Sequence, residues 1–318
     1  MISARRWVAK SFGGPEVLEE ITVELPDPGP GEVTVDVRAS GMNPADYKHF
    51  GPGQDPVLLP LTVGYEVAGV IAALGPDTEI ATGGGAVGAE VVVFQISDGY
   101  SSVVTARAED VFAKPEPLSF PQAANLLLVG TTAAETVHVV GLTAGETVLV
   151  HGAAGAVGTS VVQQSRLLGA HVVGTAAESD FEALRAFGAT PVTYGPGLTE
   201  RVREAAPGGV DAAIDTVGVD EAVDVSLALV SERKRIVSTA AFGRAKQEGF
   251  QTVGAANPHS GRFRATVRPR ILELARQGKL TVPLGQTFAF SEAPAAVEAL
   301  RGPHPYGKLA LVSAEDVS

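Results

Sequence analysis

Hydrophobic and polar positions follow two different rhythms along this chain. In the first third they alternate, as in Glu32–Ala39, where Val33, Val35 and Val37 fall on one face of a predicted strand. Further strands are predicted over Gly64–Leu74, Glu90–Phe94 and Tyr100–Ala106. Short strands at close spacing indicate a small barrel or sandwich.

The rhythm changes near Ser119, a suitable N-cap for a helix over Phe120–Leu128, and a second helix is predicted over Thr131–Val140. From Glu146 onward, predicted strands and helices alternate. The strands are Thr147–Val150, His171–Thr175, Thr190–Thr193, Val210–Ile214 and Arg235–Ser238, and the helices are Ala156–Leu168, Ser179–Phe187, Leu198–Ala205 and Asp220–Val230. This alternation is typical of a doubly wound parallel sheet.

The last part of the chain mixes both types of element. The predictions are a helix over Phe263–Arg276, a strand over Gln286–Phe290, a helix over Glu292–Arg301 with Ser291 as N-cap, and a strand over Lys308–Val312. The predicted fold class is α/β, with a β domain at residues 1–122, an inserted α/β domain at 123–262 and a return to the first domain at 263–318.

Composition narrows the range of functions. The 318 residues include 24 Lys and Arg against 36 Asp and Glu, and a net charge of −12 disfavours nucleic-acid binding. The absence of cysteine excludes disulfides, thiol nucleophiles and thiolate zinc sites. No secretory signal follows the N-terminus, and apolar runs such as Ala123–Thr132 are too short to span a bilayer. We therefore expect a cytoplasmic protein with a small-molecule partner.

A glycine-rich turn, His151–Gly158, lies between a predicted strand and a predicted helix. Small residues in such a turn let backbone amides approach a pyrophosphate, and the helix N-terminus adds partial positive charge. Gly155 fits the close-approach position of the G-x-G-x-x-G pattern and Gly158 the helix-packing position, whereas Ala153 stands at the first glycine. The strand–turn–helix context favours dinucleotide binding over a purely structural turn.

The end of the second strand in this domain bears on the choice of coenzyme. Its residues Gly174-Thr175-Ala176 lack the acid that commonly binds the ribose 2′-hydroxyl of NAD, which favours NADP. Glu178 and Asp180 follow, however, and a basic residue to hold a 2′-phosphate is missing before Leu184. The expected preference for NADPH is modest, and use of NADH stays open.

Four segments occur in a characteristic order. They are Asn43–Lys48, Gly64–Gly69, the turn His151–Gly158 and the pair Gly307-Lys308. With them the chain resembles, over nearly its whole length, a zinc-independent medium-chain dehydrogenase/reductase of the NADPH:quinone oxidoreductase branch. The resemblance implies a GroES-like catalytic domain, an inserted Rossmann domain, an active-site cleft between them and a homodimer.

The resemblance also bears on metal binding. Zinc-dependent relatives hold their catalytic zinc with Cys and His at positions that match Asn43 and Tyr65 here. A neutral amide and a phenol are poor zinc ligands, and the six histidines of the chain show no i, i+4 pair. The expected site is therefore free of metal.

The resemblance assigns coenzyme-binding residues as well. It places Asn43 and Thr131 near the nicotinamide, and Phe242 and Lys308 in segments that border it. The residues implied at the pyrophosphate are Ala154, Gly155, Ala156 and Val157, and those implied at the adenosine ribose and 2′-phosphate are Thr175, Ser179 and Tyr194.

Three side chains, Asn43, Tyr47 and Tyr65, are candidate catalytic hydrogen-bond donors. The alternatives are that Tyr47 caps the short helix after Pro44 and that Tyr65 only packs. Together these assignments predict metal-free hydride transfer from NAD(P)H to quinones or α,β-unsaturated carbonyl compounds.

Two other functions are alternatives to this prediction. A short-chain dehydrogenase is disfavoured because the sequence contains no Tyr-x-x-x-Lys and the glycine-rich turn lies in mid-chain. A non-catalytic NADPH-binding protein, structural or redox-sensing, stays open because the same turn would serve it.

Overall fold

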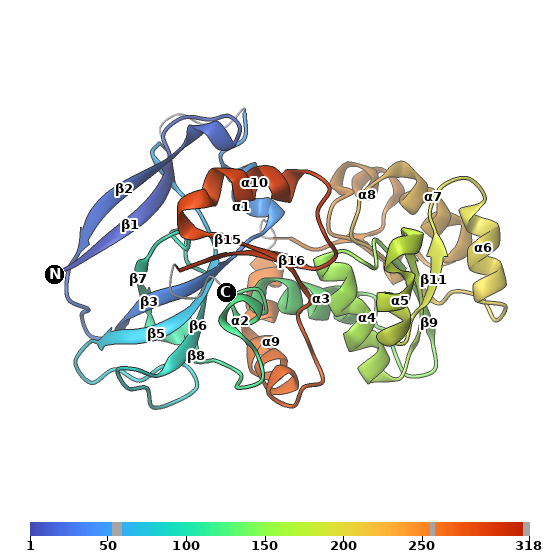
Figure 1. The fold of residues 1–318 in the computed structure, drawn as a ribbon. Helices are drawn as coiled ribbons and strands as arrows, with labels where there is room; N and C mark the ends of the chain where they lie inside the picture. Colours follow the sequence, from blue (N-terminus) through green and yellow to red (C-terminus); the bar gives the residue numbers. More distant parts are fainter. Residues whose placement is uncertain (53–58, 255–257, 314–318) are drawn as a thin grey trace. The chain divides into compact units, whose positions relative to one another are not determined.

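The computed structural model describes residues 1–52, 59–254 and 258–313 (Figure 1). The chain divides into two compact units: Met1–Leu128 together with the chain from Val282 onward, and Val129–Thr281. The boundaries between the units fall after Leu128 and after Thr281, whereas the predicted domain boundaries are residues 122 and 262. The second unit extends beyond residue 262 because the long helix that begins at residue 258 packs within it. Ile271 of that helix lies so close to Gly130 that a Cβ there would come within 2.7 Å of it.

A six-stranded parallel sheet forms the centre of the second unit. Its strands are β9 (Thr147–His151), β10 (His171–Ala176), β11 (Thr190–Thr193), β12 (Ala212–Asp215), β13 (Ile236–Ser238) and β14 (Gln251–Thr252). The helices are α3 (Leu127–Val139), α4 (Ala156–Leu168), α5 (Phe181–Ala186), α6 (Leu198–Ala205), α7 (Asp220–Leu229), α8 (Phe242–Glu248) and α9 (Pro258–Arg276). The strand order β11-β10-β9-β12-β13-β14 is the Rossmann order, so the predicted doubly wound sheet is confirmed.

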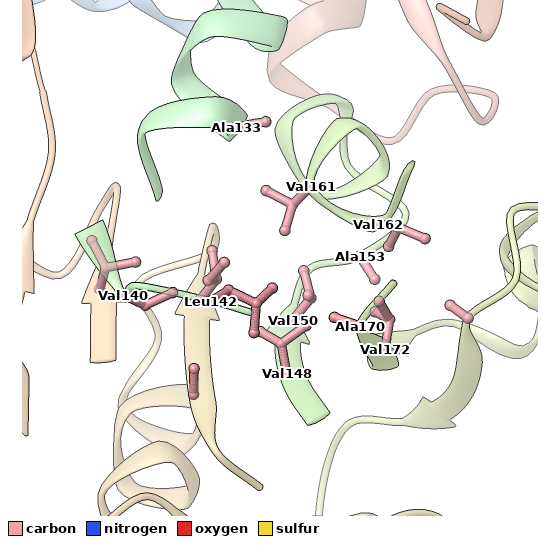
Figure 2. Close-up of a cluster of buried hydrophobic side chains, with 14 of the residues drawn as sticks. Ala133, Val140, Leu142, Val148, Val150, Ala153, Val161, Val162, Ala170 and Val172 are labelled. Carbon is pink, nitrogen blue, oxygen red and sulfur yellow. The ribbon is translucent and has the colours of Figure 1, made fainter. Parts of the chain in front are cut away.

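Both faces of this sheet are buried, which explains why its strands are almost continuously apolar. Val148 and Val150 of β9 pack with Val161 and Val162 of α4 on one face (Figure 2). Leu149, between the two valines, belongs to the core on the other face, which α6, α7 and α8 cover. The alternation within β9 thus directs successive residues to opposite layers of helices.

The first unit is built mainly from antiparallel strands. They are β1 (Ile2–Ala9), β2 (Leu18–Leu25), β3 (Glu32–Gly41), β4 (Leu61–Thr62), β5 (Glu66–Leu74), β6 (Glu90–Phe94), β7 (Val103–Arg107), β8 (Val111–Ala113), β15 (Leu284–Ala289) and β16 (Lys308–Val312). One sheet has the order β15-β16-β3-β5-β6-β8 with β7 also paired to β3, and another has the order β2-β1-β4. Val33, Val35 and Val37 share one core cluster, as predicted.

Three short helices complete the first unit: α1 (Pro44–His49), α2 (Phe120–Ala123) and α10 (Ala293–Arg301). The predicted helix over Phe120–Leu128 is wrong at its C-terminal end, although Ser119 caps α2 as expected. The helix stops because Asn125 binds backbone groups elsewhere: its side chain accepts from Met42 N and donates to Leu309 O.

The predicted N-cap Ser291 is also wrong. Phe290–Glu292 forms a 3-10 turn, and the Glu292 carboxylate accepts a hydrogen bond of 2.8 Å from Ala289 N. Helix α10 therefore begins one residue later than predicted. The elements α4, α6, β6, β11 and β16 have the predicted bounds. Others begin elsewhere than predicted: α3 begins four residues before Thr131, α9 five before Phe263 and β7 three after Tyr100. In the described part of the chain, no helix is long and apolar enough to cross a lipid bilayer.

Candidate coenzyme pocket and buried polar cluster

The turn after β9 is held by the end of β10. Gly152 has a φ of +70°, which favours glycine, and its N–H donates to Thr175 Oγ1 at 3.0 Å. Ala153 N donates to the backbone oxygen of the same threonine at 3.0 Å. The predicted coenzyme residue Thr175 thus shapes the turn directly.

The two later glycines of the turn have different surroundings. Gly155 is the N-cap of α4, with a φ of −68°, and a Cβ there would meet only the oxygen of Gly152 at 3.3 Å. A Cβ on Gly158 would come within 2.1 Å of that oxygen. Gly158 therefore permits the helix to pack on the turn, whereas the space beside Gly155 stays open for a ligand.

A pocket of about 400 Å³ opens beside this turn. Its lining is His151, Gly152, Ala154, Gly155, Thr175, Ala176, Ala177, Asp180, Tyr194, Leu198, Val217, Val219, Glu221 and Ala222. These residues follow or end β9, β10, β11 and β12, which is where doubly wound sheets bind ligands. Four residues that were predicted to bind the coenzyme, Ala154, Gly155, Thr175 and Tyr194, line this pocket. Larger side chains at Ala154 and Gly155 would reduce the space beside the turn, so the small residues there fit a dinucleotide.

Five further predicted coenzyme residues also lie in the second unit, whereas Asn43 and Lys308 belong to the first. Ala156 and Val157 form the first turn of α4, where amide N–H groups have no partner within the helix. Ser179 is exposed, 3.5 Å from Asp180 Oδ1, while Phe242 begins α8 and is 52% exposed. Thr131 is fully buried in α3.

Two carboxylates on the pocket were not predicted as site residues. Asp180 and Glu221 both line it, and the described lining includes no Lys or Arg. The rule that ligands bind at the carboxyl ends of parallel strands could have pointed to Val217 and Val219, which follow β12, but no local motif marks Glu221 on α7.

His151 ends β9 beneath the pocket and has a structural role. Its Nε2 lies 3.1 Å from Ser226 Oγ, whose own proton is donated to Ala222 O, so the imidazole is the donor. Burial lowers the pKa of His151 to about 4, an effect that nearby Asp215 partly opposes. The ring is therefore neutral at pH 7, as suits a residue that only ends a strand.

In the first unit, a buried polar cluster surrounds Asn43, the N-cap of α1. Asn43 N donates to Asp46 Oδ2 at 2.7 Å, and the same oxygen accepts from the hydroxyl of Tyr100 at 3.0 Å. The side chain of Asn43 faces Lys308 and Glu66: Oδ1 accepts from Lys308 Nζ at 2.6 Å, and Nδ2 donates to Glu66 Oε1 at 3.0 Å. The structure thus joins two predicted site residues, Asn43 and Lys308, and adds three that were missed.

Burial alters the ionisation of this cluster. It raises the pKa of Asp46 to about 7 and also raises that of Glu66, while the Lys308 ammonium opposes both shifts. Burial lowers the pKa of Lys308 itself, against the two carboxylates. Asp46 Oδ1 is buried and has no hydrogen-bond partner in the structure.

The two candidate tyrosines have different surroundings. Tyr65 is partly exposed beside Glu66, with its ring edge-on to His49 at 6.3 Å, and burial raises the pKa of its phenol. Tyr47 lies under the guanidinium of Arg301, 6.0 Å from the ring centre, and lines a separate hollow of about 310 Å³. Tyr65 therefore remains a neutral donor next to the cluster, whereas Tyr47 is turned towards α10.

Comparison with known proteins agrees with this architecture. Residues 29–139 match the alcohol dehydrogenase GroES-like domain and residues 156–267 the zinc-binding dehydrogenase model. The chain belongs to the medium-chain dehydrogenase/reductase family. The predicted α/β fold, with a GroES-like and a Rossmann part, is confirmed.

The alignments with two curated relatives cover only part of each protein. Quinone oxidoreductase of Sus scrofa is 34% identical over 52% of the chain and 50% of its own length. The synaptic vesicle membrane protein VAT-1 homolog of Rattus norvegicus is 35% identical over 66% of the chain and 53% of its own length. The alignments therefore span about half the length of these relatives.

Solved structures match almost end to end. An NAD-dependent alcohol dehydrogenase gives a TM-score of 0.84 at 27% identity, covering 97% of this chain and 99% of its own. The CurK enoyl reductase gives 0.83 at 26%, covering 98% and 99%. A mycobacterial protein complexed with NADPH gives 0.81 at 26%, covering 97% and 99%.

One of the matching family models is described as a zinc-binding dehydrogenase, but the residues of this dehydrogenase/reductase differ from a zinc site. At the matching positions stand Asn43, whose oxygen already accepts from an ammonium group, and the phenol Tyr65. A second cation beside Lys308 would be repelled, and neither side chain replaces a thiolate or an imidazole. Within the described ranges, no three His, Cys, Asp or Glu side chains gather as a metal site. The residues do not fit zinc.

Proposed function

We propose that the protein reduces quinones or α,β-unsaturated carbonyl compounds with NADPH, and more weakly with NADH. The observation that carries the proposal is the contact between the Asn43 oxygen and the Lys308 ammonium, at a position where relatives bind metal. A site built this way lacks a Lewis acid for a simple ketone. It suits an acceptor that spreads negative charge by conjugation.

The second unit supplies the residues for the coenzyme. When bound, the reduced nicotinamide supplies a hydride. The amides at Ala156 and Val157 would hold the pyrophosphate at the start of α4, beside Gly155, whose own N–H donates to Gly152 O at 3.0 Å. The preference for NADPH rests on Thr175-Ala176 at the end of β10, and Asp180 limits its strength.

The first unit supplies hydrogen-bond donors for the acceptor oxygen. Asn43 uses one of its two amide N–H groups on Glu66, which leaves the second for a substrate. Tyr65 keeps its proton because burial raises the pKa of its phenol. These groups would stabilise an enolate-like or hydroquinone oxygen until it is protonated.

The similarity to a quinone oxidoreductase and to an enoyl reductase supports this assignment. A homodimer is a further proposal from the family resemblance, and a cytoplasmic location is a further proposal from the sequence. The second candidate function is a non-catalytic NADPH-binding protein. It is favoured by the burial of Asn43 and Lys308, which bind each other as structural residues would.

Reduction of a quinone and a 2-alkenal by 4-deuterated NADPH, with and without a chelator, tests the proposal. We expect deuterium at the β-carbon of the alkenal and a rate that the chelator leaves unchanged. Activity that requires zinc, or that is confined to saturated alcohols and ketones, would contradict the proposal. Binding of NADPH without turnover of either acceptor would favour the non-catalytic alternative.

A further inference from the structure

The rim of the coenzyme pocket is unusually apolar for an exposed surface. Tyr194, Val217 and Val219 are 59%, 46% and 49% exposed, and all three line the pocket. They come from two separate loops, one after β11 and one after β12. Covering such surface is favourable, so the rim suits a flat, largely apolar ring.

The loop after β11, residues 193–197, is tied down by Arg201 of α6. The Arg201 guanidinium donates from Nε and Nη2 to Thr193 O at 3.0 and 2.8 Å, and from Nη2 to Gly195 O at 2.9 Å. Its Nη1 donates to Pro196 O at 2.8 Å. One side chain therefore satisfies three carbonyl groups in the four residues from 193 to 196, on both sides of Tyr194, and replaces the water that would otherwise solvate them.

The same loop is held from the other side by Glu221 of α7. Its Oε2 accepts a hydrogen bond of 2.9 Å from Gly195 N, and Glu221 also lines the pocket. Gly195 has a φ of +92°, which lets the backbone present its N–H to α7 and its carbonyl to Arg201. Two charged side chains thus fix one loop that carries no other regular structure.

We propose that Arg201 and Glu221 are positioning residues for the adenosine half of the coenzyme. They hold Tyr194 at the rim before the coenzyme binds. The adenine ring then lies against Tyr194, Val217 and Val219, and its binding does not have to order the loop. This role rests on the proposed binding of a dinucleotide in the pocket.

The physical basis of the proposal is preorganisation. A loop that must become ordered on binding costs affinity, whereas one that is already held by hydrogen bonds does not. Neither residue belongs to the cluster around Asn43 in the first unit. Their loss should therefore weaken coenzyme binding and leave turnover with saturating coenzyme unchanged.

Calorimetric titration with ADP-ribose, which lacks the nicotinamide, tests the role without requiring turnover. Arg201→Met should raise the Kd for ADP-ribose about tenfold. Arg201→Lys keeps the positive charge and some of the hydrogen-bond donors. Its Kd for ADP-ribose should lie between that of Arg201→Met and that of the unchanged protein. Arg203→Met is the matched control, because Arg203 lies on the same helix and pairs with Glu200 on the surface at 3.6 Å.

If Arg201→Met does not fold, Glu221→Ala tests the same role, because it removes the hydrogen bond from Gly195 N that holds the loop on the α7 side. An increase in KM for NADPH with unchanged kcat would support the positioning role. A Kd for ADP-ribose equal to that of Arg203→Met, in folded Arg201 and Glu221 variants, would overturn it. If the unchanged protein binds no ADP-ribose, the proposed coenzyme site and this role both fail.

Discussion

The methyl group of Ala153 occupies the space that a side chain at Gly174 would need. A Cβ on Gly174 would lie 2.6 Å from Ala153 Cβ, well inside van der Waals contact. Ala153 stands where the dinucleotide pattern has its first glycine, so the missing side chain on β10 accommodates the extra methyl in the turn. The departure from the usual pattern is compensated one strand away.

Gly174→Ala should therefore destabilise the protein by about 1–3 kcal/mol, because it overpacks a rigid core. Ala153→Gly in the same chain should recover much of this loss, since it removes the opposing methyl. Urea unfolding of the single and double variants measures the coupling. Gly243→Ala is the control, because a Cβ there meets no atom within 4 Å. If the changes in unfolding free energy of the two single variants simply add up in the double variant, Ala153 and Gly174 do not interact as the structure indicates.

Gly155→Val and Gly158→Ala should separate binding from folding. Valine at Gly155 has a compatible φ, and its Cβ would meet only Gly152 O, at 3.3 Å. Because Gly155 lines the pocket, Kd for NADPH should rise tenfold or more (roughly 1.4 kcal/mol). Alanine at Gly158 would press on Gly152 O and lower the unfolding temperature instead. Nicotinamide fluorescence and thermal unfolding measure the two effects. Unchanged coenzyme affinity in folded Gly155→Val would place the coenzyme elsewhere.

Ser179→Arg should strengthen the preference for NADPH. A guanidinium beside Asp180 would offset its carboxylate and supply a charge-assisted hydrogen bond to the 2′-phosphate. We expect the ratio of kcat/KM for NADPH to that for NADH to rise about tenfold, which corresponds to roughly 1.4 kcal/mol. Glu182→Gln changes the charge of the same region equally and serves as the control. An equal ratio in both variants would show that only the net charge matters.

The stability of the protein should depend on pH through Asp46. Its folded pKa of about 7 lies above the ordinary value of 3.8, so the folded state binds the extra proton between these pH values. The stabilisation is complete below about pH 4 and is lost as the pH rises to 7, at about 1.4 kcal/mol per pH unit at most. The titratable groups that face this carboxyl group are Lys308, Glu66, Tyr65 and Tyr100, and all four are kept in the Asp46→Asn variant described next.

Asp46→Asn tests this dependence because asparagine can still accept from Asn43 N and Tyr100. The free energy of unfolding of the unchanged protein, minus that of Asp46→Asn, should fall between pH 4.5 and 7.5. Chemical denaturation at several pH values measures it. A difference that is flat or rises over this range would show that Asp46 is ionised throughout.

The local sequence was sufficient for the turn and helix that follow β9. The turn at His151–Gly158 and the helix over Ala156–Leu168 were predicted correctly because strand, turn and helix are consecutive in the chain. The alternation of Val148, Leu149 and Val150 likewise reflects one strand buried on both faces. Short-range sterics and periodic burial are properties that a contiguous segment carries with it.

Relations between distant segments could not be read in this way. Lys308 meets Asn43 across 265 positions, and Glu66 reaches the same amide from β5, so their charges interact only after β3, β5 and β16 have paired. Arg201 and Glu221 come to one loop from two helices, and neither belongs to a motif. The ionisation of buried groups and the fixing of a binding loop depend on neighbours that the folded chain supplies, because desolvation and hydrogen bonding act through space and not along the sequence.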